Sequence, residues 1–123
     1  MNVLITGGLG FIGSKLVSSL IQNPQNKVCI IDNASIKDAC LANPDINLWI
    51  SNFKRSSISN SNLLINKDIF DCDLESLIEN YDVIYHLAAN PGVQKSIQDP
   101  KHDLRQNFET TFRILEAIRV SKN

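Results

Sequence analysis

A glycine cluster near the amino terminus has the spacing found in turns that bind phosphate. Gly8, Gly10 and Gly13 satisfy the pattern Gly-x-Gly-x-x-Gly, and Gly7 begins an overlapping glycine pattern. In such a turn an early glycine permits a tight bend, Gly10 lets a pyrophosphate approach the backbone, and Gly13 lets the next helix pack closely on the sheet. That helix would present unpaired N–H groups and the positive end of its dipole to the phosphates. The alternative is a glycine turn that binds no ligand.

An acidic residue follows at the distance expected of a dinucleotide site. Asp32 closes the next apolar run, about 20 residues beyond the glycines. A carboxylate at this point can accept hydrogen bonds from both ribose hydroxyls of NAD, and it would repel the 2′-phosphate of NADP. Residues 33–36 include no arginine that could hold such a phosphate, and Lys37 is the nearest cation after them. The pattern therefore favours NAD; the alternative is a turn residue at the end of a strand.

The motif requires a strand before it and a helix after it, and the sequence predicts both. Residues 2–6 and 27–31 are short apolar runs typical of buried parallel strands. Between them, residues 11–22 carry apolar side chains at helical spacing, and Pro24 ends the pattern. Strand, turn, helix and strand form a βαβ unit with an expected right-handed crossover.

The later part of the chain continues this alternation. Asp99 can cap a last helix that runs to Val120, with Pro100 at its first position, where the missing N–H costs nothing. Before that helix we expect a third strand over 63–66, a short helix near 74–78, a fourth buried strand over 82–87 and a loop over 88–98.

The segment 33–62 has the least regular pattern. We interpret 36–41 as a short helix, 48–50 as a strand fragment and 51–62 as a surface loop rich in Ser and Asn. The order of elements predicts a single α/β domain over 1–123. Its fold class is a Rossmann-like open parallel sheet of about four strands, in the order 3-2-1-4, with helices on both faces.

Composition excludes several classes of partner. The chain has 123 residues, of which 43% are hydrophobic and 20% charged, and a formal net charge of −1. Such a balance is typical of a globular domain and provides no electrostatic footprint for nucleic acid or an anionic membrane. The three cysteines form no zinc-ligand set with His86 and His102, so no metal is expected. No secretory signal is recognised, so the expected location is the cytoplasm.

With these residues identified, the chain resembles the NAD-dependent epimerase/dehydratase family, the extended short-chain dehydrogenases that act on nucleotide sugars. The resemblance covers nearly the whole chain except about 34–62. Besides the glycine turn and Asp32-Asn33, it is carried by four stretches in the family's order: Lys67 to Asp71, with Lys in place of the usual Gly; Val83 to Ala89; Ser96 to Pro100; and Gln106 to Phe108 with Leu115 to Ala117.

The resemblance implies a role for individual residues around NAD. The glycine turn would cradle the pyrophosphate, the residues after the second strand would hold the adenosine ribose, and those after the third would flank the adenine. Small residues after the fourth strand would line the nicotinamide ribose side, and an asparagine in the last helix would support the active-site turn. In that order the residues are Gly7, Gly10, Phe11, Ile12 and Gly13; Asp32 and Asn33; Asp68 and Ile69; Leu87, Ala88 and Ala89; and Asn107.

The family's catalytic residues have no counterpart in this sequence. Its chemistry needs a Tyr-x-x-x-Lys pair, but Tyr81 is followed four residues later by Tyr85, and Tyr85 by Ala89. No catalytic residue is therefore assigned, and the sugar-binding part is also absent from these 123 residues. The resemblance implies the NAD-binding portion of a nucleotide-sugar epimerase or dehydratase, inactive alone, with residues 90–96 most similar to 4-epimerases of the UDP-glucose type.

Two other interpretations stay open. The chain could be a non-catalytic NAD(H)-binding module or a subunit completed by another chain, or it could be a degenerate remnant. In each case a half-built sheet would leave the fourth strand as an apolar edge and expose an apolar face of the last helix. We therefore expect marginal stability alone, or dependence on self-association or on a partner chain.

Overall fold

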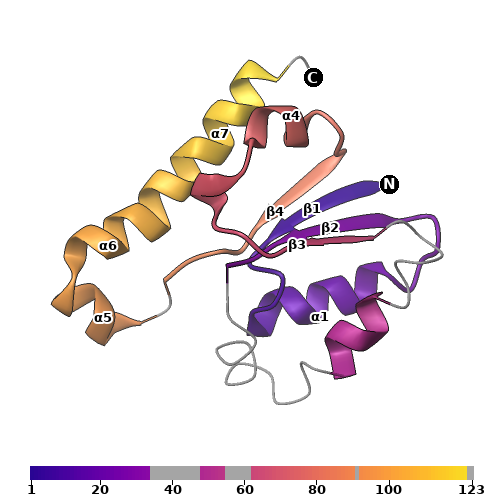
Figure 1. The fold of residues 1–123 in the computed structure, drawn as a ribbon, viewed down its shortest axis with the longest axis horizontal. Helices are drawn as coiled ribbons and strands as arrows, with labels where there is room; N and C mark the ends of the chain where they lie inside the picture. Colours follow the sequence, from indigo (N-terminus) through magenta and orange to yellow (C-terminus); the bar gives the residue numbers. More distant parts are fainter. Residues whose placement is uncertain (34–47, 55–61, 91, 122–123) are drawn as a thin grey trace.

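The computed structural model describes residues 1–33, 48–54, 62–90 and 92–121. Its centre is a parallel sheet of four strands in the order β3-β2-β1-β4 (Figure 1). The bounds of the strands are Asn2–Thr6 for β1, Lys27–Ile31 for β2, Leu63–Ile65 for β3 and Val83–His86 for β4. This topology confirms the predicted sheet, including its strand order.

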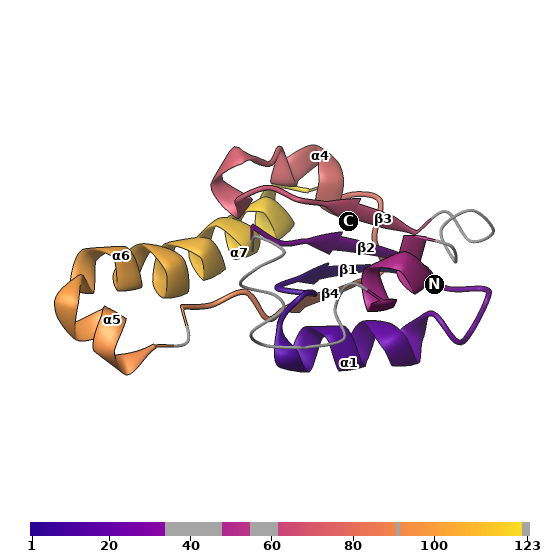
Figure 2. The same cartoon turned by 60° about the horizontal axis from the view of Figure 1, so that its bottom comes forward.

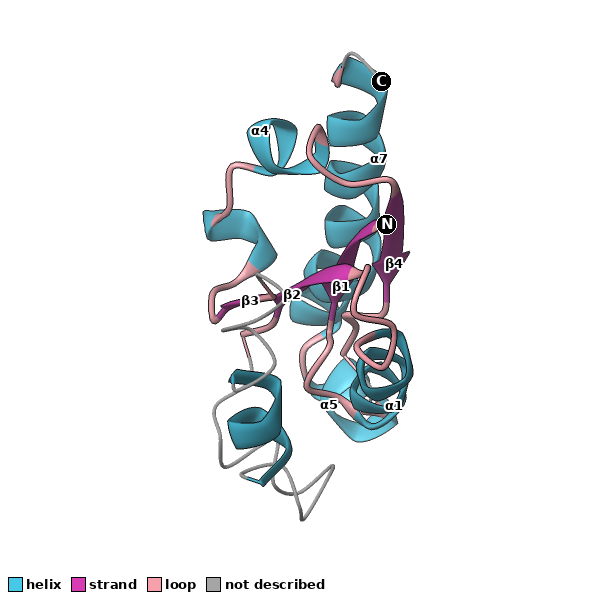
Figure 3. Cartoon of the chain, turned by 90° about the vertical axis from the view of Figure 1, so that its right-hand side faces the viewer, coloured by secondary structure: helices cyan, strands magenta, loops and turns pink. Residues whose placement is uncertain are grey.

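Side chains of the central strands alternate between two separate cores, because successive residues of a strand point to opposite faces. Leu4 of β1 faces the helices α4 (Leu74–Ile78) and α7 (Thr110–Val120). Val3 and Ile5 face the helix α1 (Phe11–Leu20) and the helical residues 48–54. Figures 2 and 3 show the two layers on opposite sides of the sheet, as predicted.

The last helix begins where its capping signals indicate. Asp99 accepts a hydrogen bond from the N–H of His102 at 3.0 Å, and Pro100 is the first residue of α6 (Pro100–Leu104). From α6 the chain continues through one π-helical turn, η2 (Arg105–Glu109), into α7. Figure 1 shows that α5 (Val93–Gln98) and α6 extend beyond the carboxyl ends of the strands.

Two predictions of local structure were wrong. Residues 48–50 were expected to form a strand and 51–54 a loop, but residues 48–54 are helical. Trp49 and Phe53 are one helical turn apart, their rings stack with centroids 5.5 Å apart, and Phe53 is buried against the core. A three-residue apolar run cannot distinguish a strand from a helix that docks in this way. The predicted helix over 36–41 lies outside the described residues.

The second wrong prediction concerns residues 88–98, which were expected to be a loop throughout. The helix α5 forms over the last six of them. Its apolar residues Val93 and Ile97 are exposed, so no buried apolar stripe marks the helix in the sequence. Instead the single hydroxyl proton of Ser96 lies between two acceptors, the carbonyl of Gly92 at 2.9 Å and the Oδ1 of Asp103 at 2.7 Å. Side-chain hydrogen bonds rather than burial hold this helix in place.

An apolar surface remains exposed along β4, α6, η2 and α7. β4 is an outer strand of the sheet, as expected of a half-built sheet, so this predicted buried strand is only partly buried and its Tyr85 is exposed. Along α6, η2 and α7, six large apolar side chains are between 40% and 64% exposed: Leu104, Phe108, Phe112, Leu115, Ile118 and Val120. These exposures agree with the sequence-based expectation that the last helix would show an apolar face.

The helical segment 48–54 provides a direct test of the core under β1 and β2. We predict that Phe53→Ala lowers the free energy of unfolding by about 3–5 kcal/mol, because a ring that is 1% exposed would leave a cavity. The exposed neighbour Lys54 supplies the control, since Lys54→Ala should change stability by less than about 0.5 kcal/mol. Equilibrium urea unfolding, followed by far-ultraviolet circular dichroism, measures both. Equal effects of the two substitutions would contradict the docking of this helix.

Candidate functional site

The glycine turn reverses the chain at the carboxyl end of β1, in contact with the loop that follows β4. Gly7 has a φ of +70°, a region that residues with a side chain rarely adopt. A Cβ at this position would lie 2.6 Å from the backbone nitrogen of Ala88. The N–H of Gly7 donates to the carbonyl of Ile31 at 2.9 Å, so the turn is also tied to the end of β2. Gly7 is therefore the tight-bend glycine of the motif.

The other three glycines of the motif differ in whether a side chain would collide with the fold. A Cβ on Gly13 would overlap the carbonyl oxygen of Gly7, and a Cβ on Gly8 would lie 2.6 Å from the side chain of Ile30. Gly10 has a φ of −68°, and a Cβ there would meet only the oxygen of Gly7, at 3.3 Å. The fold itself thus requires glycine at 7, 8 and 13 far more than at Gly10, where the missing side chain leaves space beside the helix end.

The amino terminus of α1 faces this open space. Gly10 is its N-cap, and no side chain caps the helix with a hydrogen bond. The first two residues of the helix, Phe11 and Ile12, are exposed. The first-turn N–H groups of an α-helix have no intrahelical partner, and they favour an anion. The predicted pyrophosphate residues are thus brought together at one helix end.

Asp32 is held against the glycine turn. It is 8% exposed, and its Oδ2 accepts a hydrogen bond from the N–H of Leu9 at 2.8 Å. Its backbone is fixed as well, because the N–H of Asp32 donates to Ile65 and its carbonyl accepts from the side chain of Asn66 at 2.8 Å. A carboxylate is therefore placed at the carboxyl edge of the sheet, beside the turn, as the spacing predicts.

The residues predicted to flank the adenine lie one strand further along the edge. Asn33 donates from Nδ2 to the Oδ2 of Asp68 at 2.8 Å, and the Oδ1 of Asp68 accepts the N–H of Phe70. Partial burial opposes the charge of Asp68, but these hydrogen bonds and the nearby Arg105 together lower the pKa of its carboxyl group. Ile69 is buried in the core that α7 covers, so its predicted packing on adenine stays a prediction.

The loop after β4 lies against the glycine turn on the other side. The N–H of Leu87 donates to the carbonyl of Thr6 at 3.0 Å, and the N–H of Ala88 donates to the Thr6 hydroxyl at 3.3 Å. Leu87 and Ala89 are exposed, and Ala88 is half-buried. The structure thus brings all three predicted nicotinamide-side residues to the same edge of the sheet as the glycine turn.

A cluster of polar side chains fixes the next part of this loop to the last helix. Asn107 accepts the N–H of Asn90 at 2.7 Å and donates from Nδ2 to the Oδ1 of Asp103 at 2.9 Å. The same carboxylate oxygen accepts the side chains of Asn90 and Ser96, at 3.0 and 2.7 Å. Asn107 was predicted to support this turn, whereas no pattern in the sequence marks Asp103.

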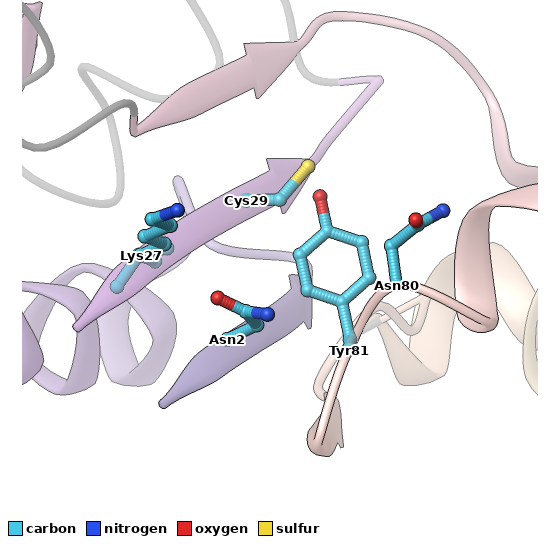
Figure 4. A pocket seen from close by; sticks show the side chains of 6 residues that line it. Asn2, Lys27, Cys29, Asn80 and Tyr81 are labelled. Atoms are coloured by element: carbon cyan, nitrogen blue, oxygen red, sulfur yellow. The ribbon is translucent and has the colours of Figure 1, made fainter. Parts of the chain in front are cut away.

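A cavity of about 180 Å³ lies at the opposite end of the sheet, where β1 and β2 begin (Figure 4). Figure 4 shows Tyr81 directed toward Cys29, with Asn2, Lys27 and Asn80 around them. Burial and a hydrogen bond with Cys29 raise the pKa of Tyr81, which is the reverse of what an acid–base tyrosine needs. Within the described residues no group of three or more His, Cys, Asp and Glu could hold a metal ion, and no helix could span a membrane.

The two kinds of glycine position should respond differently to substitution. Gly7→Ala should lower the free energy of unfolding by at least about 1–2 kcal/mol, because φ is positive and the new methyl group meets backbone. Gly10→Ala should cost less than about 1 kcal/mol, since its conformation suits any residue. Urea unfolding of both variants measures the difference, and similar losses would contradict the assignment of Gly10 to a ligand rather than to packing.

Comparison with known proteins agrees with this geometry. The family model described as GDP-mannose 4,6 dehydratase matches residues 4–123. A relative from Bacillus subtilis strain 168, an uncharacterized UDP-glucose epimerase, YtcB, is 34% identical over 120 residues, covering 97% of this chain and 36% of its own length. The dTDP-glucose 4,6-dehydratase of Escherichia coli is also 34% identical, over 122 residues, covering 97% of this chain and 31% of the enzyme.

A solved structure shows the same fold. UDP-glucuronic acid 4-epimerase from Bacillus cereus, in complex with UDP-glucuronic acid and NAD, superposes with a TM-score of 0.78 at 34% identity. The match covers 99% of this chain and 37% of that one. The chain therefore spans about a third of the length of the relatives that it matches. With the family model matched over nearly its whole length, the chain belongs to the GDP-mannose 4,6 dehydratase family of NAD-dependent nucleotide-sugar epimerases and dehydratases.

Proposed function

We propose that this chain is the NAD-binding portion of a nucleotide-sugar epimerase or dehydratase. One observation carries the proposal: the Asp32 carboxylate is anchored to the glycine turn beside an uncapped helix end, on the carboxyl edge of a parallel sheet. In open α/β sheets, ligands bind outside the carboxyl ends of the strands. The B. cereus epimerase whose fold matches this chain was crystallised with NAD, which supports the same cofactor here.

We propose the following order of contacts between the described residues and the parts of NAD. The pyrophosphate would lie over Gly10 against the first N–H groups of α1, where a Cβ would otherwise intrude. Asp32 and Asn33 would hold the adenosine ribose, with Asp68 beside the adenine and Leu87 to Ala89 along the nicotinamide ribose. When bound, the nicotinamide would supply hydride transfer to and from a sugar carbon.

The absence of a Tyr-x-x-x-Lys pair from these 123 residues supports a binding role rather than catalysis by the chain alone. We propose no catalytic residue, and the complete reaction would need groups outside this sequence. Residues 90–96 resemble 4-epimerases of the UDP-glucose type, and the B. subtilis relative is named as an uncharacterized UDP-glucose epimerase. The E. coli dehydratase is equally similar, so the proposal covers both reactions. A non-catalytic NAD(H)-binding subunit is the second candidate, supported by the glycine turn, Asp32 and the loop after β4 at one edge of the sheet.

The Asp32 carboxylate allows a sharp test of the cofactor proposal. We predict that the chain binds NAD⁺ in preference to NADP⁺, and that Asp32→Ala weakens NAD⁺ binding by about 10- to 100-fold, the value of charge-assisted hydrogen bonds to the ribose. Gly10→Ala should also weaken binding, because its methyl group would occupy the space of the pyrophosphate. Calorimetric titration measures each affinity.

Circular dichroism controls for folding, because Asp32 also holds the turn through Leu9. Lys15 is an exposed residue of α1, the helix that follows the glycine turn. Its substitution, Lys15→Ala, is a matched control that should leave both fold and affinity unchanged. If a folded Asp32→Ala variant binds NAD⁺ as tightly as the original chain, the assignment of Asp32 to the ribose is wrong.

We further propose that the exposed apolar surface needs a polypeptide cover. In a preparation of the chain alone, this cover would have to be a second copy of the chain. We therefore predict self-association at micromolar concentration, measured by sedimentation. Phe108→Lys together with Phe112→Lys should shift the chain toward a monomer that trypsin degrades quickly, because charges would replace two exposed aromatic rings. A monomeric original chain that resists limited tryptic digestion would contradict this proposal.

A further inference from the structure

The ring of His86 connects three elements at the carboxyl edge of the sheet. Its Nδ1 lies 2.6 Å from the hydroxyl of Thr6, the last residue of β1. Its Nε2 lies 3.1 Å from the hydroxyl of Thr111, in the first turn of α7. Thr6 precedes the positive-φ Gly7 in the chain, so the ring joins the start of the glycine turn to the long helix.

The neighbours of the two hydroxyls determine where the protons lie. Thr111 donates its hydroxyl proton to the carbonyl of Asn107 at 2.7 Å, so toward the ring it accepts from Nε2–H. The Thr6 hydroxyl accepts the N–H of Ala88, and its own proton is directed to an unprotonated Nδ1. The neutral ring with its proton on Nε2 satisfies both ends, because the Thr6 hydroxyl then donates to Nδ1 while it accepts the N–H of Ala88. Burial lowers the pKa of His86, which favours the same neutral form.

These contacts form a connected network of hydrogen bonds around the loop that follows β4. At one end of the loop, Thr6 holds the N–H of Ala88; at the other, the side chain of Asn107 holds the N–H of Asn90. His86 and Thr111 join Thr6 to the backbone of Asn107. The two anchors of the loop are thus linked to each other through one imidazole.

We infer that His86 is a positioning residue that sets residues 87–90 through Thr6 and Thr111, and so fixes the nicotinamide side of the cofactor site. The part concerning NAD rests on the proposed function, whereas the positioning of the loop does not. The alternative is a purely local role, in which the ring only fills space beside β1 and β4. The two differ at Asn90, because the hydrogen bonds between described residues connect the ring to Asn90 through Thr111 and Asn107.

The test uses amide hydrogen exchange of the 123-residue chain by NMR, with the His86 ring nitrogens observed in the same sample at pH 7.5. We expect the ring to be protonated at Nε2 alone. In Thr6→Val and in His86→Phe, exchange at both Ala88 and Asn90 should quicken about tenfold or more, while Val28 and Ile30 in the core stay protected. Thr6→Ser, which keeps the hydroxyl, should exchange like the original chain.

Faster exchange at Ala88 with no change at Asn90, or a ring protonated at Nδ1, would overturn the inference. The affinity for NAD⁺ of the same variants is measured separately. It should fall by about tenfold in Thr6→Val and be retained in Thr6→Ser. An original chain that shows the expected exchange pattern but does not bind NAD⁺ would refute the proposed function and leave the positioning role supported. Unchanged affinity in Thr6→Val would overturn the cofactor part of the inference.

Discussion

The candidate cofactor site depends on one constraint, the close approach of three backbone segments at Gly7. The turn at Gly7 fits between the end of β2 and the loop after β4 only without a side chain, and Gly13 then brings α1 against the same turn. Because protein interiors are close-packed, one added methyl group here must displace backbone rather than a flexible side chain. The helix end, the Asp32 carboxylate and the loop at Ala88 are all positioned relative to this contact.

Hydrogen bonds and charges then fix the side chains at the carboxyl ends of the strands. On one side Asp32 contacts the turn through Leu9, and Asp68 is kept ionised by its donors. On the other side the hydroxyl of Thr6 and the ring of His86 bind the loop, and Asn107 holds its far end. The glycine turn, Asp32 and the loop after β4 are thus each held by hydrogen bonds between described residues, while large apolar side chains along α7 are exposed.

Most features predicted correctly from sequence have local signals, whereas the strand order follows from the succession of strands and helices. The glycine spacing, the apolar runs of β1 and β2 and the cap at Asp99 each determine structure within a few residues. The helix over 48–54 was missed because its stability comes from Phe53 docking under a distant sheet. Asp103 and the contact of His86 with Thr111 were missed because they depend on how α6 and α7 cross the edge, which no local pattern encodes. The assignments of individual residues to NAD remain predictions.

Chemical-shift mapping of NAD⁺ on the isotopically labelled chain tests the central claim most directly. The account predicts saturable shifts at Gly7 to Gly13, Asp32, Asn33 and Asp68, and in the loop at Leu87 to Ala89, with none around Asn2 and Asn80 at the opposite end of the strands. Shifts centred on that opposite end, or no shifts in a chain whose spectrum shows it to be folded, would contradict the claim that these residues form a cofactor site.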